Sequence, residues 1–204
     1  MKVLIIDDNE RLSQIYQSII SQEGHQTEIE VDSNNAIDRI QEIKPDLVLL
    51  DIMMEPLSGW DVLELIRSNE VFFDLPVIIL TGKMMTMQEA FKYGMQIEGF
   101  IMKPLERSMI ISSIQEVWEI LTECEARYVR AIKAGLSEEK AAGCRRMIRK
   151  RKILAYLKDL LARQEQIVNL RPDEASEMRD TIDQLKRMIE GEYMEFARGE
   201  LTCP

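Results

Sequence analysis

The sequence contains little cysteine and histidine, and this scarcity limits the sites it can form. Its three cysteines, Cys124, Cys144 and Cys203, lie far apart without Cys-x-x-Cys spacing. We therefore expect reduced thiols, and neither a disulfide framework nor a zinc site. The single histidine, His25, excludes metal sites built from several histidines.

Long apolar runs are also absent. No run approaches the roughly 20 residues that a membrane-spanning helix needs. The start of the chain, MKVLIIDDNE, has an apolar part too short for a signal peptide. We therefore expect a cytoplasmic protein. The net charge of −10 argues against binding nucleic acid through the overall field, although a local basic patch could still do so.

The charge that is present is unevenly divided. Residues 1–121 carry 9 Lys and Arg against 21 Asp and Glu, a balance of −12. Residues 122–204 carry 17 Lys and Arg against 15 Asp and Glu, a balance of +2. The hydrophobic pattern also becomes helical in the second part. We place one domain at residues 1–121 and a helical output or dimerisation module at residues 122–204.

The first part alternates short apolar runs with amphipathic stretches. The runs predict five buried strands at residues 2–6, 28–31, 46–50, 77–80 and 99–102. The stretches predict helices at residues 10–22, 34–43, 58–68, 85–94 and 105–121, with Gly24 as a left-handed cap after the first. This alternation predicts an α/β fold with a doubly wound parallel sheet, whose site belongs at the carboxyl ends of the strands.

Polar residues stand at the predicted carboxyl ends of four strands. Asp7 and Asp8 follow the first strand, Asp51 the third, Thr81 ends the fourth and Lys103 the fifth. Three carboxylates in one crevice repel one another unless a cation neutralises them. An oxygen-only ligand set suits Mg²⁺. The pattern therefore predicts a magnesium site at this edge.

These residues lie in segments that resemble the receiver domain of two-component response regulators. The resemblance covers residues 1–121 and rests on LIIDDNE, LVLLDIMM with the following Gly59, VIILTG and GFIMKPL. It implies a flavodoxin-like fold with helices on both faces of a five-stranded sheet of order 2-1-3-4-5.

The resemblance also implies a role for each acid of the site. Asp51 would accept a phosphoryl group from the phosphohistidine of a sensor histidine kinase. Asp8, Asp51 and the main-chain carbonyl of Met53 would bind Mg²⁺, and Asp7 would act partly through water. His25 lies in the predicted turn EGHQ, away from these acids, so we expect the donor histidine on another protein.

The resemblance further implies a switch. Lys103 would pair with the phosphoryl group, Thr81 would hydrogen-bond to it, and Phe100 would fill the space that Thr81 vacates. The Lys103–Pro104 peptide would be cis, since X-Pro bonds adopt this form most easily. No separate acid–histidine or nucleophile–base set is present, so we expect a phosphoacceptor with self-catalysed transfer and dephosphorylation, and no further enzyme.

Three features depart from the family pattern, and one of them is that Phe100 stands where Tyr is more frequent. Position 55 is Glu, and the expected loop proline is displaced to Pro56. Met53 and Lys83 stand two residues after Asp51 and Thr81, at positions that in this family influence the access of water to the acyl phosphate. Neither is an acid or amide that could orient water, so we hypothesise slow self-dephosphorylation.

The second part predicts three helices. From Leu105 to Ala134 there is no Pro or Gly, and a heptad repeat runs through Ile110, Ile114, Val117, Leu121, Cys124, Tyr128 and Ala131. Either the second half of this helix starts a separate bundle, or one rigid helix carries the state of the first domain outward. Gly135 ends the helix and Ser137 caps the next, and the connection NLRPDE favours an antiparallel hairpin with Pro172 in the first turn of the last helix.

One basic segment stands out in this part. It contains Arg145, Arg146, Arg149, Lys150, Arg151 and Lys152. Such a run could contact the acidic face of a partner or the phosphates of a nucleic acid. We favour a module for homodimerisation or for binding a downstream protein. A nucleic-acid-binding transcription regulator is the alternative.

Overall fold

A computed structural model describes residues 1–103, 106–170 and 176–200. For residues 144, 146–149, 151–152, 163–170, 176–178 and 195–200 it describes the main chain alone. The predicted cis peptide at Lys103–Pro104 and the predicted helical turn at Pro172 lie outside the described residues. Within the described residues, no helix is long and apolar enough to cross a membrane.

Five parallel strands form a single sheet. In spatial order they are β2 (Gln26–Glu30), β1 (Lys2–Ile6), β3 (Leu47–Asp51), β4 (Val77–Thr81) and β5 (Gly99–Met102). This order confirms the predicted fold, a five-stranded parallel sheet of order 2-1-3-4-5. Successive strands are joined through helices because parallel strands need a crossover connection.

The helices have clear limits. They are α1 (Glu10–Gln22), α2 (Ala36–Ile43), α3 (Gly59–Ser68), α4 (Met87–Tyr93), α5 (Arg107–Lys133), α6 (Glu138–Leu170) and α7 (Ser176–Glu200), with short 3₁₀ turns η1 (Ser33–Asn35) and η2 (Gly94–Gln96). The chain forms two compact units. The first unit comprises residues 1–84 and 96–116, and the second comprises residues 85–95 and 117–204. The domain boundary at 121/122 stays a prediction.

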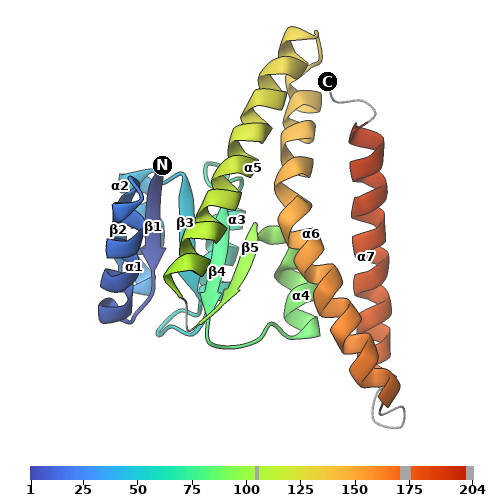
Figure 1. Ribbon diagram of the computed structural model, residues 1–204, viewed down its shortest axis with the longest axis horizontal. Helices are drawn as coiled ribbons and strands as arrows, with labels where there is room; N and C mark the ends of the chain where they lie inside the picture. Colours follow the sequence, from blue (N-terminus) through green and yellow to red (C-terminus); the bar gives the residue numbers. More distant parts are fainter. Residues whose placement is uncertain (104–105, 171–175, 201–204) are drawn as a thin grey trace. The chain divides into compact units, whose positions relative to one another are not determined.

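The first unit is built around the sheet. Every residue of β3 and β4 is buried, because these central strands are covered on both faces. The α1 helix and the start of α5 lie together on one face, where Arg107 hydrogen-bonds to Gln22 and Glu23, and α2 lies beside α3 on the other (Figure 1). The prediction that all five strands are buried is wrong for β2, which is half exposed because it forms an edge of the sheet.

Helix ends follow local chemistry. Gly24 and Gly135 both have a φ of 84°, the left-handed conformation expected of glycine after a helix. The α3 helix begins with a capping box, in which the Ser58 hydroxyl accepts from the Asp61 N–H and the Asp61 carboxylate accepts from the Ser58 N–H. This cap fixes the start of α3 directly after the loop that follows β3.

The second unit consists of α4, the later part of α5, α6 and α7. Its α6 and α7 helices form the predicted antiparallel hairpin (Figure 1). The heptad positions of α5 face inward, since Cys124 and Ala131 are buried and Leu121 and Tyr128 are half-buried. Ile153, Leu154 and Leu157 of α6 and Ile182, Leu185 and Ile189 of α7 are buried as well.

The short helix α4 contacts α7 within this unit. The turn that follows α4 contacts α6, and a Cβ built on Gly94 would lie only 2.8 Å from Cδ2 of Leu157. Only a glycine fits at this position without moving the leucine. Sequence reasoning placed α4 in the first domain, and it did not predict this contact.

Candidate functional site

The carboxyl edge of the sheet brings the predicted polar residues together. Asp51 is the last residue of β3 and pairs with Leu80, and Thr81 is the last residue of β4 and pairs with Met102. Asp7 directly follows β1, and Lys103 directly follows β5. The Lys103 N–H donates to the Thr81 carbonyl over 2.7 Å, which fixes the start of the following loop.

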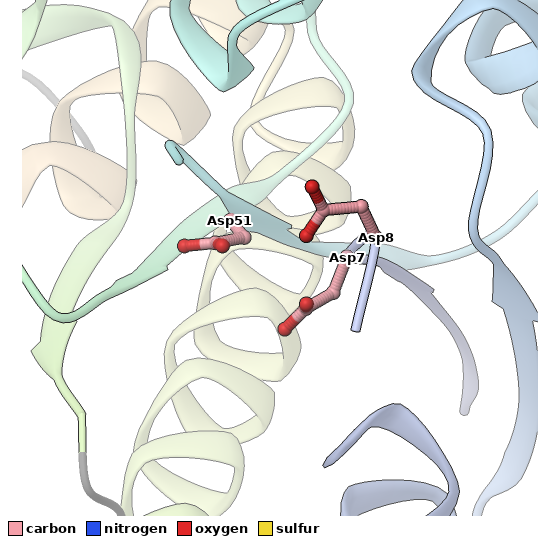
Figure 2. A group of neighbouring side chains, drawn as sticks. All are labelled: Asp7, Asp8 and Asp51. Atoms are coloured by element: carbon pink, nitrogen blue, oxygen red, sulfur yellow. The ribbon is translucent and has the colours of Figure 1, made fainter. Parts of the chain in front are cut away.

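Three carboxylates form the centre of the site. Asp7, Asp8 and Asp51 each offer an oxygen, and these oxygens lie within 4.8 Å of one another (Figure 2). Asp7 and Asp51 are only 1% and 5% exposed, whereas Asp8 is open to solvent. The site therefore has two buried acids and one acid at its mouth.

Lys103 bridges the two buried acids. Its Nζ lies 2.7 Å from Oδ2 of Asp7 and 3.2 Å from Oδ2 of Asp51. Burial raises the pKa of the Asp51 carboxyl and the charge of Asp7 adds to this, while the Lys103 ammonium opposes both effects. One ammonium cannot balance three carboxylates, so the site retains negative charge.

The α3 helix approaches Asp51 closely. The Gly59 N–H donates to the Ile52 carbonyl over 3.0 Å, and a Cβ on Gly59 would overlap the main-chain carbonyl of Asp51. A side chain at position 59 would therefore displace the backbone that carries Asp51. The Ile52 N–H donates to Oδ1 of Asp51 over 2.9 Å and orients the carboxylate.

Thr81 and Phe100 lie on neighbouring strands. Thr81 is fully buried, and its Oγ1 accepts from the Lys83 N–H over 3.2 Å. Phe100 is half-buried and pairs with Ile79, two residues before Thr81. Side chains two residues apart on a strand share a face, so Thr81 and Phe100 belong to the same face of the sheet.

Tyr16 was missed by sequence reasoning. It lies on α1 and is 2% exposed. Burial raises the pKa of its phenol to about 12, with further contributions from the charges of Asp7 and Asp51. An isolated tyrosine on an amphipathic helix carries no signal of a site in the sequence. The structure places Tyr16 near enough to Asp7 and Asp51 for the charges of both acids to act on it.

Other predicted residues are not part of this site. His25 is half-buried between α1 and β2. Burial lowers its pKa, the amino terminus adds to this, and Glu23 opposes it.

In the loop after Asp51, the Glu55–Pro56 peptide is cis. Sequence reasoning did not predict this feature, although it identified Pro56 as displaced.

The basic segment lies on α6, in the second unit. Arg145 lies 4.0 Å from Glu125 and stacks over the ring of Tyr128, and Lys150 lies 3.3 Å from Glu192. The side chains of Arg146, Arg149, Arg151 and Lys152 lie outside the described residues. The two bases that are described therefore both have an acidic neighbour within their own unit.

The donor set of the site fits a hard divalent cation. Asp7, Asp8 and Asp51 supply oxygen atoms alone, and their residual negative charge favours a cation. Asp8 and Asp51 would be the direct ligands, with Asp7 held by Lys103. The main-chain carbonyl of Met53, two residues beyond Asp51, could complete the protein's contribution.

Comparisons with known proteins agree with this geometry. Residues 3–115 match the model of the response regulator receiver domain. Similar curated proteins include the DNA-binding response regulators MtrA of Mycolicibacterium paratuberculosis and Mycobacterium leprae, each 27% identical over 114 residues. Those residues cover 56% of this chain and 49% of each relative, so the match spans about half the length of these proteins.

Solved structures support the fold. A response regulator from Desulfuromonas acetoxidans is 24% identical with a TM-score of 0.53, covering 59% of this chain and 98% of that chain. The chemotaxis protein CheY4 of Vibrio cholerae is 22% identical with a TM-score of 0.52, covering 56% of this chain and 96% of that chain. At these identities the likeness establishes the fold alone.

Proposed function

The chain belongs to the response regulator receiver domain family, and from this premise we propose that it accepts a phosphoryl group on Asp51 and relays that event to its helical unit. The proposal rests on one observation. Asp51 is a buried carboxylate at the end of β3, held 3.2 Å from the Lys103 ammonium within a cluster of three acids.

The chemistry is phosphoryl transfer from a phosphohistidine of a sensor histidine kinase. A carboxylate oxygen of Asp51 attacks phosphorus, the P–O bond forms, and the P–N bond to the histidine breaks. Mg²⁺ at the acidic cluster would neutralise charge on the phosphoryl oxygens. Lys103 is placed to move from Asp7 and Asp51 to the phosphoryl group, because its Nζ already bridges the two carboxylates.

The switch proposed for this site uses Thr81 and Phe100. The phosphoryl group of an acyl phosphate carries a charge of about −1.5 to −2 and strong hydrogen-bond acceptors, in place of the single negative charge of the carboxylate. The Thr81 hydroxyl, which accepts from the Lys83 N–H, would turn to donate to a phosphoryl oxygen. Phe100, on the same face of the sheet, would then occupy the space that Thr81 leaves.

The relay is supported by the place of α4. Residues 82–86 connect Thr81 to α4, and α4 contacts α7 while Gly94 contacts Leu157 of α6. A displacement of the loop after Thr81 would therefore act directly on the hairpin. We expect this unit to form a homodimer or to bind a downstream protein, and we expect the protein to act in the cytoplasm.

Slow loss of the phosphoryl group is a further part of the proposal. Met53 is 61% exposed beside Asp51, and it has no group that could orient a water molecule. Lys83 lies two residues beyond Thr81 and likewise has no acid or amide that could orient the attacking water. The lifetime of the acyl phosphate, followed in Mg²⁺ at neutral pH, should be long. A lifetime of a few seconds would contradict this part.

Labelling with phosphoramidate tests the proposal. Intact mass should increase by one phosphoryl group in the presence of Mg²⁺, and the increase should disappear in Asp51→Asn. Asp38→Asn is a matched control, since Asp38 is an exposed acid on α2 away from the strand ends. Equal labelling of the parent protein and Asp51→Asn would reject the assignment.

The alternative is a regulator that binds nucleic acid through the basic segment of α6. It is favoured by the curated relatives, which are named DNA-binding response regulators. The proximity of Arg145 to Glu125 and of Lys150 to Glu192 weighs against it, because those acids compete with phosphates. A mobility-shift assay at two salt concentrations separates the two functions. Specific retention that is weakened by Arg145→Ala, Arg146→Ala and Arg149→Ala would favour the alternative.

A further inference from the structure

Exposed methionines gather at the carboxyl edge of the sheet. In the described part of the chain, the largest methionine exposures are those of Met53, Met84, Met102, Met109 and Met194, at 61%, 54%, 37%, 42% and 59%. Met53 and Met84 lie in the loops after β3 and β4, and Met102 is the last residue of β5. We call Met53, Met84 and Met102 the methionine rim.

Each rim residue is a neighbour of a site residue. Met53 stands two residues after Asp51 and Met84 stands three residues after Thr81. Met102 is the register partner of Thr81 and precedes Lys103. The rim therefore follows the same three strand ends that carry Asp51, Thr81 and Lys103.

The same loops contain buried methionines beside the exposed ones. Met54 is 5% exposed next to Met53, and Met85 is 2% exposed next to Met84. Apolar packing accounts for Met54 and Met85, but it does not account for their exposed neighbours. What distinguishes the rim is that its thioethers are open to solvent beside the site.

Exposure decides the chemistry of a thioether. A peroxide must reach the sulfur lone pair, so an exposed methionine is oxidised in preference to a buried one. Conversion to the sulfoxide changes a flexible apolar side chain into a polar one with a strong hydrogen-bond acceptor. At the rim this acceptor would appear beside three carboxylates.

We propose that the methionine rim is an oxidative modification site that controls the acceptance of phosphate by Asp51. A hydroperoxide transfers one oxygen to each sulfur. The O–O bond breaks, the S–O bond forms, the sulfur is oxidised by two electrons, and the peroxide is reduced to water or an alcohol. The inference rests on the proposed function of Asp51.

The expected consequence is slower phosphorylation. Phosphoryl donors are anionic, and the rim residues lie at or just beyond the strand ends that carry Asp51, Thr81 and Lys103. The negative ends of new sulfoxide dipoles oppose the approach of the donors and add to the residual negative charge of Asp7, Asp8 and Asp51. A thiol-dependent methionine sulfoxide reductase would restore the apolar rim, since the S–O bond breaks, the oxygen leaves as water and two thiols are oxidised to a disulfide.

The first experiment measures the modification itself. The full-length folded protein is treated with hydrogen peroxide, and the oxidation of each methionine is followed by peptide mass spectrometry. Met53, Met84 and Met102 should oxidise at least about tenfold faster than Met54 and Met85, because only the former are exposed. Equal rates at neighbouring positions would overturn the proposal, whatever the function of Asp51.

The second experiment measures the consequence. Phosphoramidate labelling is timed before and after peroxide, and the ratio of the two rates is compared between the parent protein and Met53→Leu/Met84→Leu/Met102→Leu. In the parent protein the rate after peroxide should be about one third of the rate before it, because the apolar rim is lost. In the triple variant the two rates should be nearly equal. Both proteins keep all their cysteines, which controls for thiol oxidation.

A second control tests whether the effect belongs to the rim, and two further outcomes distinguish failure of this inference from failure of the proposed function. Met109→Leu/Met194→Leu removes two exposed methionines outside the rim and should respond to peroxide like the parent. An unchanged labelling rate after selective oxidation would overturn the inference alone. Absence of labelling before peroxide would instead overturn the proposed function.

Discussion

The two units of the chain differ in the polar residues that they bury. Among the described residues, the buried polar or charged residues are Asp7, Ser13, Ser33, Asp51 and Thr81, and all five belong to the first unit. The described residues that are buried in the second unit are hydrophobic, and most of them lie on α4, α5, α6 and α7, although the Nε atoms of Arg127 and Arg145 are also shielded from solvent. The first unit therefore buries polar side chains at the carboxyl edge of its sheet, where the candidate site lies, whereas the described core of the second unit is formed mainly by packing between helices.

The difference also shows how each unit is specified. In the first unit, the register of four strand pairs decides which side chains meet at the carboxyl edge. In the second unit, single stripes of apolar residues at helical spacing decide which helix faces meet. Four measurements can break or sharpen this comparison, beginning with the largest expected effect.

The helical unit should be most sensitive to loss of packing. Leu157 is fully buried on α6 and contacts Gly94. Leu157→Ala should lower the free energy of unfolding of the second unit by about 2–5 kcal/mol, because it leaves a cavity. Hydrogen exchange should rise in α4 and α6 while β1 and β3 stay protected.

Val129→Ala provides the control for this substitution. Val129 is 40% exposed on α5, so its truncation should change the unfolding free energy by at most about 0.5 kcal/mol. Equal effects of the two substitutions would mean that the packing between α6 and the turn after α4 contributes nothing to stability.

The sheet edge should be most sensitive to added volume. Gly59→Ala places a methyl group against the carbonyl of Asp51, and overpacking of this kind costs about 1–3 kcal/mol. We expect lower stability to urea and slower phosphoramidate labelling together. Gly82→Ala is the matched control, since a Cβ at Gly82 meets nothing within 4 Å. A Gly59→Ala variant with parental stability and labelling would contradict the close approach of α3.

The acidic cluster should lower the free energy of unfolding in the absence of Mg²⁺. The pKa of Asp51 is raised in the folded state, so ionisation of this carboxyl disfavours folding. This loss of folding stability is absent at a pH below the ordinary pKa of an aspartate. It grows as the pH rises above that pKa, and it is fully present at neutral pH. Asp51→Asn should therefore increase the free energy of unfolding at pH 7.

Urea titrations at pH 7 in a chelator measure this difference. The gap between the parent and Asp51→Asn should narrow on addition of Mg²⁺, which stabilises only the protein that retains its carboxylates. A less stable Asp51→Asn variant would show that the ion pair with Lys103 outweighs the repulsion within the cluster.

The smallest effect concerns His25. Its pKa is lowered from 6.5 by burial, with a further contribution from the amino terminus. The contribution of neutral His25 to stability is present above its unfolded pKa and is lost as the pH falls through that value. A nuclear magnetic resonance titration of the single imidazole should give a midpoint below 6.5, and a higher midpoint would indicate an acidic partner.

Much of the first unit could be predicted from the sequence. Parallel strands buried on both faces are apolar throughout, so β1, β3, β4 and β5 are visible as short runs of Val, Ile and Leu. The polar residues that follow those runs predicted the edge where Asp7, Asp51, Thr81 and Lys103 meet. Gly24 and Gly135 predicted helix ends because glycine adopts the left-handed conformation most easily.

Other features depend on contacts that no local pattern records. Lys103 bridges Asp51 and Asp7, and it lies 96 positions from Asp7 in the sequence. The burial of Tyr16 depends on how α1 packs against the sheet. The contacts of α4 with α7 and of Gly94 with Leu157 arise only when the hairpin of α6 and α7 has formed. The exposure of β2 could not be predicted from a local pattern either, because it depends on the strand order that places β2 at the edge of the sheet.

The central claim is that phosphorylation of Asp51 reaches the helical unit through α4. Hydrogen exchange of the full chain, measured with and without phosphoramidate in Mg²⁺, tests it most directly. We predict that phosphorylation changes the protection of residues 82–95 and of the segment of α6 around Leu157, and that Asp51→Asn abolishes the change. A phosphorylated protein with unaltered protection in both segments would contradict the claim.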